Sequence, residues 1–145
     1  VEALTKGDTR SAQREVDAAR LWPETLGAGK PYPADVDERL EDFLAAQGLA
    51  RLGRSAPSKE LLQKVTAFEG RERGGSTLVH ALALKQTGRE AEGRTLLAEW
   101  SARQPESPLA AWATRAYDGQ VGPLPEGAAE DARVLAAWLA SATRP

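Results

Sequence analysis

Apolar side chains recur every three or four positions along most of the chain, which is the spacing of one face of an α-helix. β-branched residues are scarce, and no stretch alternates apolar and polar positions as a half-buried strand does. The pattern therefore predicts an all-α fold of about seven helices, over residues 8–21, 35–53, 58–68, 77–87, 90–103, 107–119 and 128–143.

Residues that begin and end helices mark several of these boundaries. Asp35, with Glu38 three positions later, forms a variant of the capping box, and Ser58 begins the next predicted helix. Gly53 and Gly88 stand just after apolar runs, where a glycine commonly ends a helix. Most connections are short, and short connections make neighbouring helices antiparallel, so we expect stacked helical hairpins.

Small and large side chains follow a definite order in residues 81–105. Ala81 and Leu84 lie in the first predicted helix, Gly88 makes the turn, Leu97 lies in the second helix, and Pro105 ends it. This order resembles the tetratricopeptide repeat (TPR), a helix–turn–helix unit of about 34 residues.

Two positions of this hairpin depart from the TPR pattern. Gly93 stands where alanine is usual, which weakens its helix by about 1 kcal/mol relative to alanine but permits a close approach of the two helices. Trp100 stands where a small residue is usual, so we expect this hairpin to pack wider than a standard repeat.

Two other parts of the chain match the TPR pattern less completely. With Gly7 as the turn, the small, large and small positions of a second helix fall on Ala12, Val16 and Ala19, and Pro23 arrives one residue early. With Gly53 as the turn, Ala46 and Leu49 fit the first helix, but we expect the segment "RSAPSK" to displace the second.

The resemblance covers about residues 1–118 and implies a right-handed solenoid of TPR-like hairpins, the first truncated at its N-terminus. A linker over residues 119–127 and a capping helix over 128–145 are expected to follow. The resemblance to TPR proteins also implies a non-catalytic module. Such a module binds another protein, or another domain of the same parent protein, through the inner face of its first helices. Carried over to this sequence, that face comprises Gln47, Arg51, Leu82, Lys85 and Gln86. Because Leu82 is apolar, we expect another segment to cover part of the face. A generic antiparallel helical bundle is the alternative architecture.

The segment "LWPETLGAGKPY", residues 21–32, is similar to a Tyr-Pro-Glu-Asn-Leu-Gly-x-Gly phrase that joins helical repeats in large bacterial proteins. Trp22 replaces the usual tyrosine, and Thr25 replaces the asparagine. Those proteins carry a galactose-mutarotase-like β-sandwich before a TPR tail. The similarity implies an alternative function, as the C-terminal accessory domain of a carbohydrate-active enzyme whose catalytic part is not in this chain.

Composition narrows the possible partners. The chain has 19 basic and 21 acidic residues, so it lacks the basic excess of a general nucleic-acid binder, and no apolar run is long enough to span a membrane. Cysteine is absent, which excludes disulfides and thiolate sites.

Methionine is absent too, so we expect a processed chain or a piece of a longer one. The arginine-rich composition is typical of a GC-rich, bacterial genome. A cytoplasmic location is favoured, and the oligomeric state stays open.

No pattern predicts a catalytic, cofactor-binding or metal-ligating residue, which makes a stand-alone hydrolase the weakest hypothesis. His80 is the only histidine and has no partner spacing typical of a zinc site or a triad, so it is interpreted as a packing residue. The acidic stretch "DVDERLED" is explained by the helix dipole. The segment "GRERGG" lacks the P-loop frame and is interpreted as a turn, with a generic anion site at the next helix start as the alternative.

The four tryptophans allow two interpretations. Trp112 has apolar neighbours at helical spacing and is predicted to lie in the core. Trp22, beside a proline, and Trp138, placed opposite Ala132 and Ala136 on its helix, are candidates for an interface.

Overall fold

A computed structural model of the chain describes residues 36–70, 72 and 74–142. This part contains six α-helices and no β-strand: α3 (Arg39–Arg51), α4 (Ser55–Thr66), α5 (Gly74–Gln86), α6 (Glu90–Arg103), α7 (Pro108–Tyr117) and α8 (Glu130–Ala142). The all-α prediction is confirmed for these residues. The predicted helix over residues 8–21 and the candidate Trp22 lie outside the described residues.

Three helices begin three or four residues away from their predicted first residues, and α8 begins two residues later than predicted. α3 begins four residues later, after Glu38 at its N-cap position, and the predicted cap Asp35 lies outside the described residues. α4 and α5 each begin three residues earlier than predicted. The early start of α5 takes in Gly75, whose lack of a side chain lets α8 approach: a β-carbon there would lie 3.2 Å from the backbone of Ala132. Tertiary packing therefore outweighs the weak helix propensity of glycine at this end.

The predicted helix ends at Gly53 and Gly88 are confirmed. Both glycines have positive φ, +74° and +83°, which is the left-handed conformation that L side chains rarely adopt. After α5, the Gly88 N–H donates to the Lys85 carbonyl at 3.2 Å, and the Arg89 N–H donates to the Leu84 carbonyl at 2.8 Å. This pair of bonds is the Schellman motif, which satisfies the last carbonyls of the helix while it reverses the chain.

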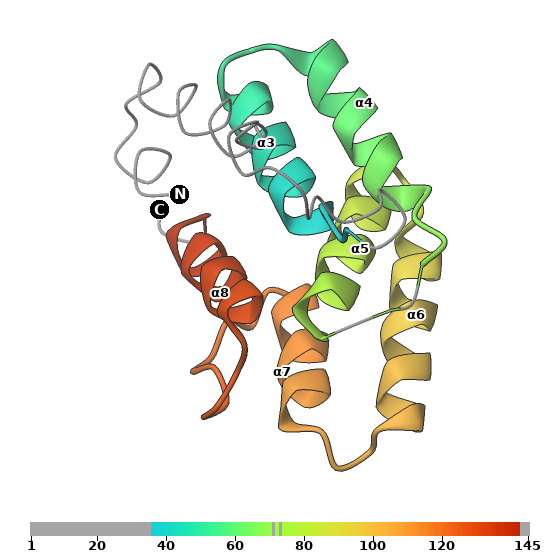
Figure 1. Cartoon of the computed structure of the whole chain (residues 1–145), viewed down its shortest axis with the longest axis vertical. Helices are drawn as coiled ribbons and strands as arrows, with labels where there is room; N and C mark the ends of the chain where they lie inside the picture. The colour runs from blue at the N-terminus through green and yellow to red at the C-terminus, as the bar shows by residue number, and fades with distance from the viewer. Residues whose placement is uncertain (1–35, 71, 73, 143–145) are drawn as a thin grey trace, which may run out of the picture.

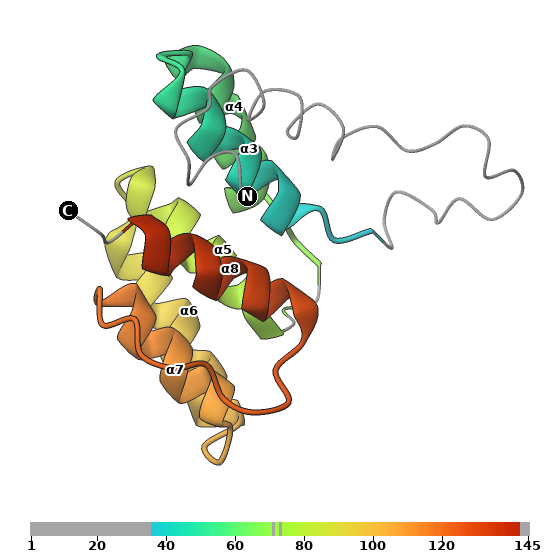
Figure 2. The same ribbon diagram turned by 90° about the vertical axis from the view of Figure 1, so that its left-hand side faces the viewer.

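The helices form two layers with α8 across one of them. α3 packs on α4 and α5 packs on α6, so each pair is a hairpin, and α5 also contacts α3, α4 and α7. As a result α3, α5 and α7 make one layer, and α4 and α6 make a second layer beside it (Figure 1). α8 contacts α5, and Figure 2 shows it lying across the α5 and α7 side of the molecule.

The two hairpins match each other at a constant offset of 35 residues. The first and last residues of α3 and α5 differ by 35 (74 − 39 and 86 − 51), as do the first residues of α4 and α6 (90 − 55). The turn glycines Gly53 and Gly88 also differ by 35 (88 − 53). The predicted displacement of the helix after "RSAPSK" is therefore wrong, because most of that segment belongs to α4.

A small residue of the second helix lies against the same carbonyl of the first helix in both hairpins. Ser58 follows Ala46 by 12 residues, and its hydroxyl donates to the Ala46 carbonyl at 2.8 Å. Gly93 follows Ala81 by 12 residues (93 − 81), and a β-carbon there would lie 2.8 Å from the Ala81 carbonyl oxygen. Ser58 thus serves hairpin packing rather than the predicted helix start, and the close approach predicted at Gly93 is confirmed.

The core lies between the layers and beneath α8. Trp112 is fully buried, as predicted, together with Phe43, Leu78 and Leu135 from three other helices. The Trp112 indole N–H donates to the Gly122 carbonyl at 3.1 Å, and this bond holds the segment after α7 against α7 itself. Within the described residues, no helix has both the length and the apolar character needed to cross a membrane.

Candidate functional site

The predicted inner-face residues Gln47 and Gln86 meet where α3 and α5 lie side by side. The Gln47 amide nitrogen donates to the Gln86 oxygen at 2.8 Å, and the Gln86 nitrogen lies 3.4 Å from the Gln47 oxygen. Gln86 is exposed and Gln47 is half-buried. The two hairpins thus share an amide pair that faces solvent.

Lys85 extends this polar surface to α7. Its ammonium donates to the Tyr117 carbonyl at 3.1 Å and lies 4.7 Å from the centre of the Tyr117 ring. Arg51 is exposed, one turn after Gln47 on α3. We call Gln47, Arg51, Lys85 and Gln86 the polar row; it lies at the C-terminal ends of α3 and α5.

Two other predicted interface residues are buried. Leu82 is 9% exposed, so little of its side chain is open to a partner. Trp138 is 7% exposed and meets the Phe43 ring edge-on, with 5.3 Å between ring centres. Trp138 is therefore a core residue and not an exposed anchor. Its indole N–H is buried and has no hydrogen-bond partner among the described residues.

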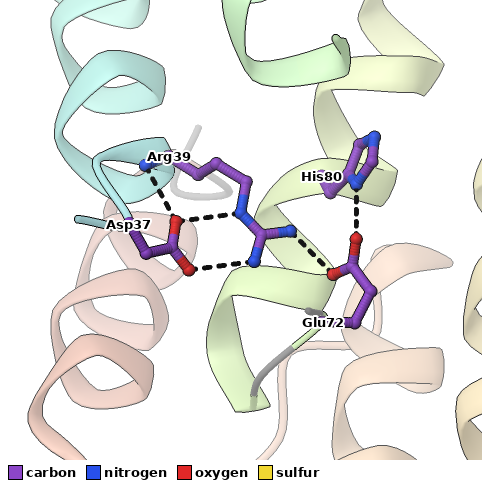
Figure 3. Close-up of polar contacts among 4 residues, drawn as sticks. All are labelled: Asp37, Arg39, Glu72 and His80. Atoms are coloured by element: carbon purple, nitrogen blue, oxygen red, sulfur yellow. Dashed lines mark hydrogen bonds and ion pairs between the residues drawn. The ribbon is translucent and has the colours of Figure 1, made fainter. Parts of the chain in front are cut away.

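An ion network that no pattern in the sequence predicts joins the two hairpins (Figure 3). Arg39, at the start of α3, donates to both carboxylate oxygens of Asp37 at 2.9 Å and to Glu72 at 2.7 Å. The other oxygen of Glu72 lies 2.8 Å from His80 Nδ1 of α5. The Arg39 guanidinium also stacks 3.7 Å from the centre of the Phe68 ring, in the segment between the hairpins.

In this network, hydrogen bonds between opposite charges outweigh the effect of burial on the carboxyl pKa values. Arg39 is only 2% exposed. Burial alone would raise the pKa of the Asp37 and Glu72 carboxyls, but hydrogen bonds from Arg39, and from His80 to Glu72, outweigh it and hold both pKa values below the usual range. Both groups are therefore carboxylates at neutral pH, and Arg39 is a fully paired buried cation.

The network holds the two hairpins together, and we call Asp37, Arg39, Glu72 and His80 the clamp. His80 is bound to Glu72, Glu72 is shared with Arg39, and each nitrogen of the Arg39 guanidinium bonds to Asp37 or Glu72. The interpretation of His80 as a packing residue agrees with this arrangement, although its partner Glu72 comes from "GRERGG", which was expected to be only a turn. No signal in the sequence could pair Arg39 with a residue 33 positions away.

Two residues of the acidic stretch "DVDERLED" have a local partner on α4. Lys64 of α4 lies 2.6 Å from Asp42 and 3.0 Å from Glu38, which links the two helices of the first hairpin. At the start of α5, where an anion site was the alternative, the Asp131 carboxylate of α8 lies close to Gly75. In the part of the chain that the structure describes, no three His, Cys, Asp or Glu side chains come together as metal ligands would.

The carbohydrate-associated alternative depends on residues 21–32, which lie outside the described residues. No protein-family model, no curated protein and no solved structure matches the chain.

Proposed function

We propose that this chain is a TPR-like helical-repeat module that mediates interaction with another protein, or with another domain of its parent protein, and that its hairpins continue a right-handed solenoid. The observation that carries the proposal is the 35-residue offset that the helix starts and turn glycines of the α3/α4 and α5/α6 hairpins share. A hairpin of this length that repeats in register and stacks on its neighbour is the unit of helical-repeat proteins, which present extended binding surfaces.

Side-chain packing within the hairpins supports the same function. In both hairpins a small residue brings the second helix against a carbonyl of the first, at Ser58 and at Gly93. These two residues occupy the position at which the TPR pattern has alanine. Equivalent residues thus make equivalent helix–helix contacts in the two hairpins, as expected of copies of one repeat.

The polar row is the surface that we assign to the interaction. It joins the first helices of both hairpins through the Gln47–Gln86 pair and reaches α7 through Lys85. Amide and cationic groups at a solvent-facing junction can exchange their hydrogen bonds for bonds to a partner at little cost. α8 packs on α5 of the same layer, whereas the side chains of the polar row are exposed or half-buried among the described residues.

Site-specific photo-cross-linking tests this assignment. A benzophenone amino acid is placed at Gln86 in the polar row and, as a control, at exposed Ala98 on α6. We expect irradiation in the source cells to give one discrete adduct at position 86, either with a partner protein or within the parent chain, and none at position 98.

Mass spectrometry of the adduct identifies which of these two it is. Equal labelling at positions 86 and 98, or no adduct at position 86, would count against an interaction surface on the polar row.

A further inference from the structure

A groove of about 450 Å³ lies between α4, α5 and α6, with His80 and Leu84 of α5 in its lining. Its volume falls within the range of about 300–1,000 Å³ that is typical of ligand pockets. Successive helical residues are turned by about 100°, so His80 and Leu84 point away from the side of α5 that carries Leu82 and Gln86. The groove is therefore a separate surface from the polar row.

The two hydroxyl groups of the groove are available only as acceptors. Thr66 donates its hydroxyl hydrogen to the Gln63 carbonyl at 3.0 Å, and Thr95 donates to the Ala91 carbonyl at 3.0 Å. Both hydrogens are thus used within their own helices. The oxygen lone pairs remain for a ligand that donates hydrogen bonds.

His80 adds another acceptor. Because hydrogen bonds hold the Glu72 pKa below its usual range, Glu72 is a carboxylate, and His80 Nδ1 must carry the hydrogen that joins them at 2.8 Å. In the neutral imidazole the other nitrogen, Nε2, then has a lone pair. Nε2 makes no hydrogen bond with any of the described residues.

One charge in the groove lining is left unbalanced. Arg89 and Glu92 neutralise each other through two bonds of 2.7 and 2.6 Å. Glu99 also lines the groove and forms no ion pair with the residues that the structure describes. Leu84 and Leu96 supply apolar surface beside these groups. The groove therefore combines an apolar wall, one negative charge and several unused acceptors.

We propose that this groove binds a basic side chain, lysine or arginine, of a partner polypeptide. The hydrocarbon stem lies along Leu84 and Leu96, and the cationic head donates to the Glu99 carboxylate, the Thr95 hydroxyl and His80 Nε2. An anionic group is disfavoured because it would face Glu99 and lone pairs without a free counter-charge. Glu92 and Glu99 stand two turns apart on α6, about 10 Å, so the groove is long enough for a short extended segment.

The test is an NMR titration of the ¹⁵N-labelled chain at pH 8 with the peptide Ac-Ala-Leu-Lys-Leu-Ala-NH₂. The same peptide with norleucine in place of lysine keeps the stem and lacks the ammonium. We expect the lysine peptide to shift the amides of Leu84, Thr95 and Glu99 saturably and to bind at least about threefold more tightly than the norleucine peptide, the ratio of one half-exposed ion pair.

The variant Glu99→Gln should lose this preference for lysine, whereas Glu106→Gln, an exposed carboxylate in the turn after α6, should keep it. Shifts that do not saturate, shifts outside the groove, equal affinity for the two peptides, or an unchanged preference in Glu99→Gln would each overturn the proposal.

Discussion

Replacement of Gly93 by alanine separates the local preference of α6 from the packing of its hairpin. Alanine is favoured over glycine inside a helix by about 1 kcal/mol, so local propensity alone predicts a more stable protein. In the structure, however, the added β-carbon would lie 2.8 Å from the Ala81 carbonyl oxygen and 2.7 Å from the Tyr117 hydroxyl. Contacts this short force α6 away from α5 or move the tyrosine.

The net effect is a balance of three contributions to the free energy of unfolding. Overpacking of a close helix contact costs about 1–3 kcal/mol. Displacement of Tyr117 also breaks the 3.0 Å hydrogen bond from its hydroxyl to the Glu90 carbonyl, which contributes about 1 kcal/mol. Against the propensity gain of about 1 kcal/mol, we expect Gly93→Ala to destabilise the protein by about 2 kcal/mol.

Urea unfolding followed by circular dichroism measures this change. The control Ala98→Gly, at an exposed position of the same helix, should cost about 1 kcal/mol from propensity alone. In a Tyr117→Phe background, Gly93→Ala should cost less but should still destabilise, because the Ala81 carbonyl is part of the backbone. A gain of about 1 kcal/mol in Gly93→Ala would refute the close packing of α5 and α6.

Three further outcomes are expected. Because the Asp37 and Glu72 pKa values are lowered in the folded protein, their ion pairs contribute stability above about pH 4, and this contribution is lost as pH falls through the folded pKa values. Urea titrations from pH 6 to 3 should therefore show a steeper loss of stability in the wild type than in Glu72→Gln; equal slopes would refute the pairing. Trp112→Phe should cost at least about 1 kcal/mol more than Trp138→Phe in thermal unfolding, because only the Trp112 indole has an acceptor to leave unpaired. Arg39→Met should destabilise by about 3–5 kcal/mol, because it leaves two part-buried carboxylates without their cation; a loss under 1 kcal/mol would argue against the clamp.

Features that depend on neighbours in sequence could be predicted from the sequence. Helical spacing located the helices that the structure describes, and Gly53 and Gly88 marked the ends of α3 and α5 because left-handed backbone geometry selects for glycine. The TPR resemblance assigned both Gln47 and Gln86 to the inner face of their helices, but that the two side chains pair was seen only in the structure.

Features that depend on distant residues could not be predicted. Arg39 and Glu72 pair only because the segment after α4 returns past the start of α3. Trp138 was assigned to an interface because it was placed opposite Ala132 and Ala136 on its helix. In the structure the buried arc of α8, from Ala132 to Trp138, spans about 120° around the helix, since α8 lies across other helices and not along a single partner.

The stacking of the two hairpins is tested most directly by a cross-link across them. The chain has no cysteine, so the double variant Gln47→Cys/Gln86→Cys carries only the two introduced thiols, and Gln47→Cys/Ala98→Cys is its matched control. A short bismaleimide should join positions 47 and 86 within one chain, rapidly and nearly completely, as read by intact mass and peptide mapping. It should leave positions 47 and 98 unlinked. Equal reaction in the two variants, or no link between 47 and 86, would contradict the stacking of α3 beside α5.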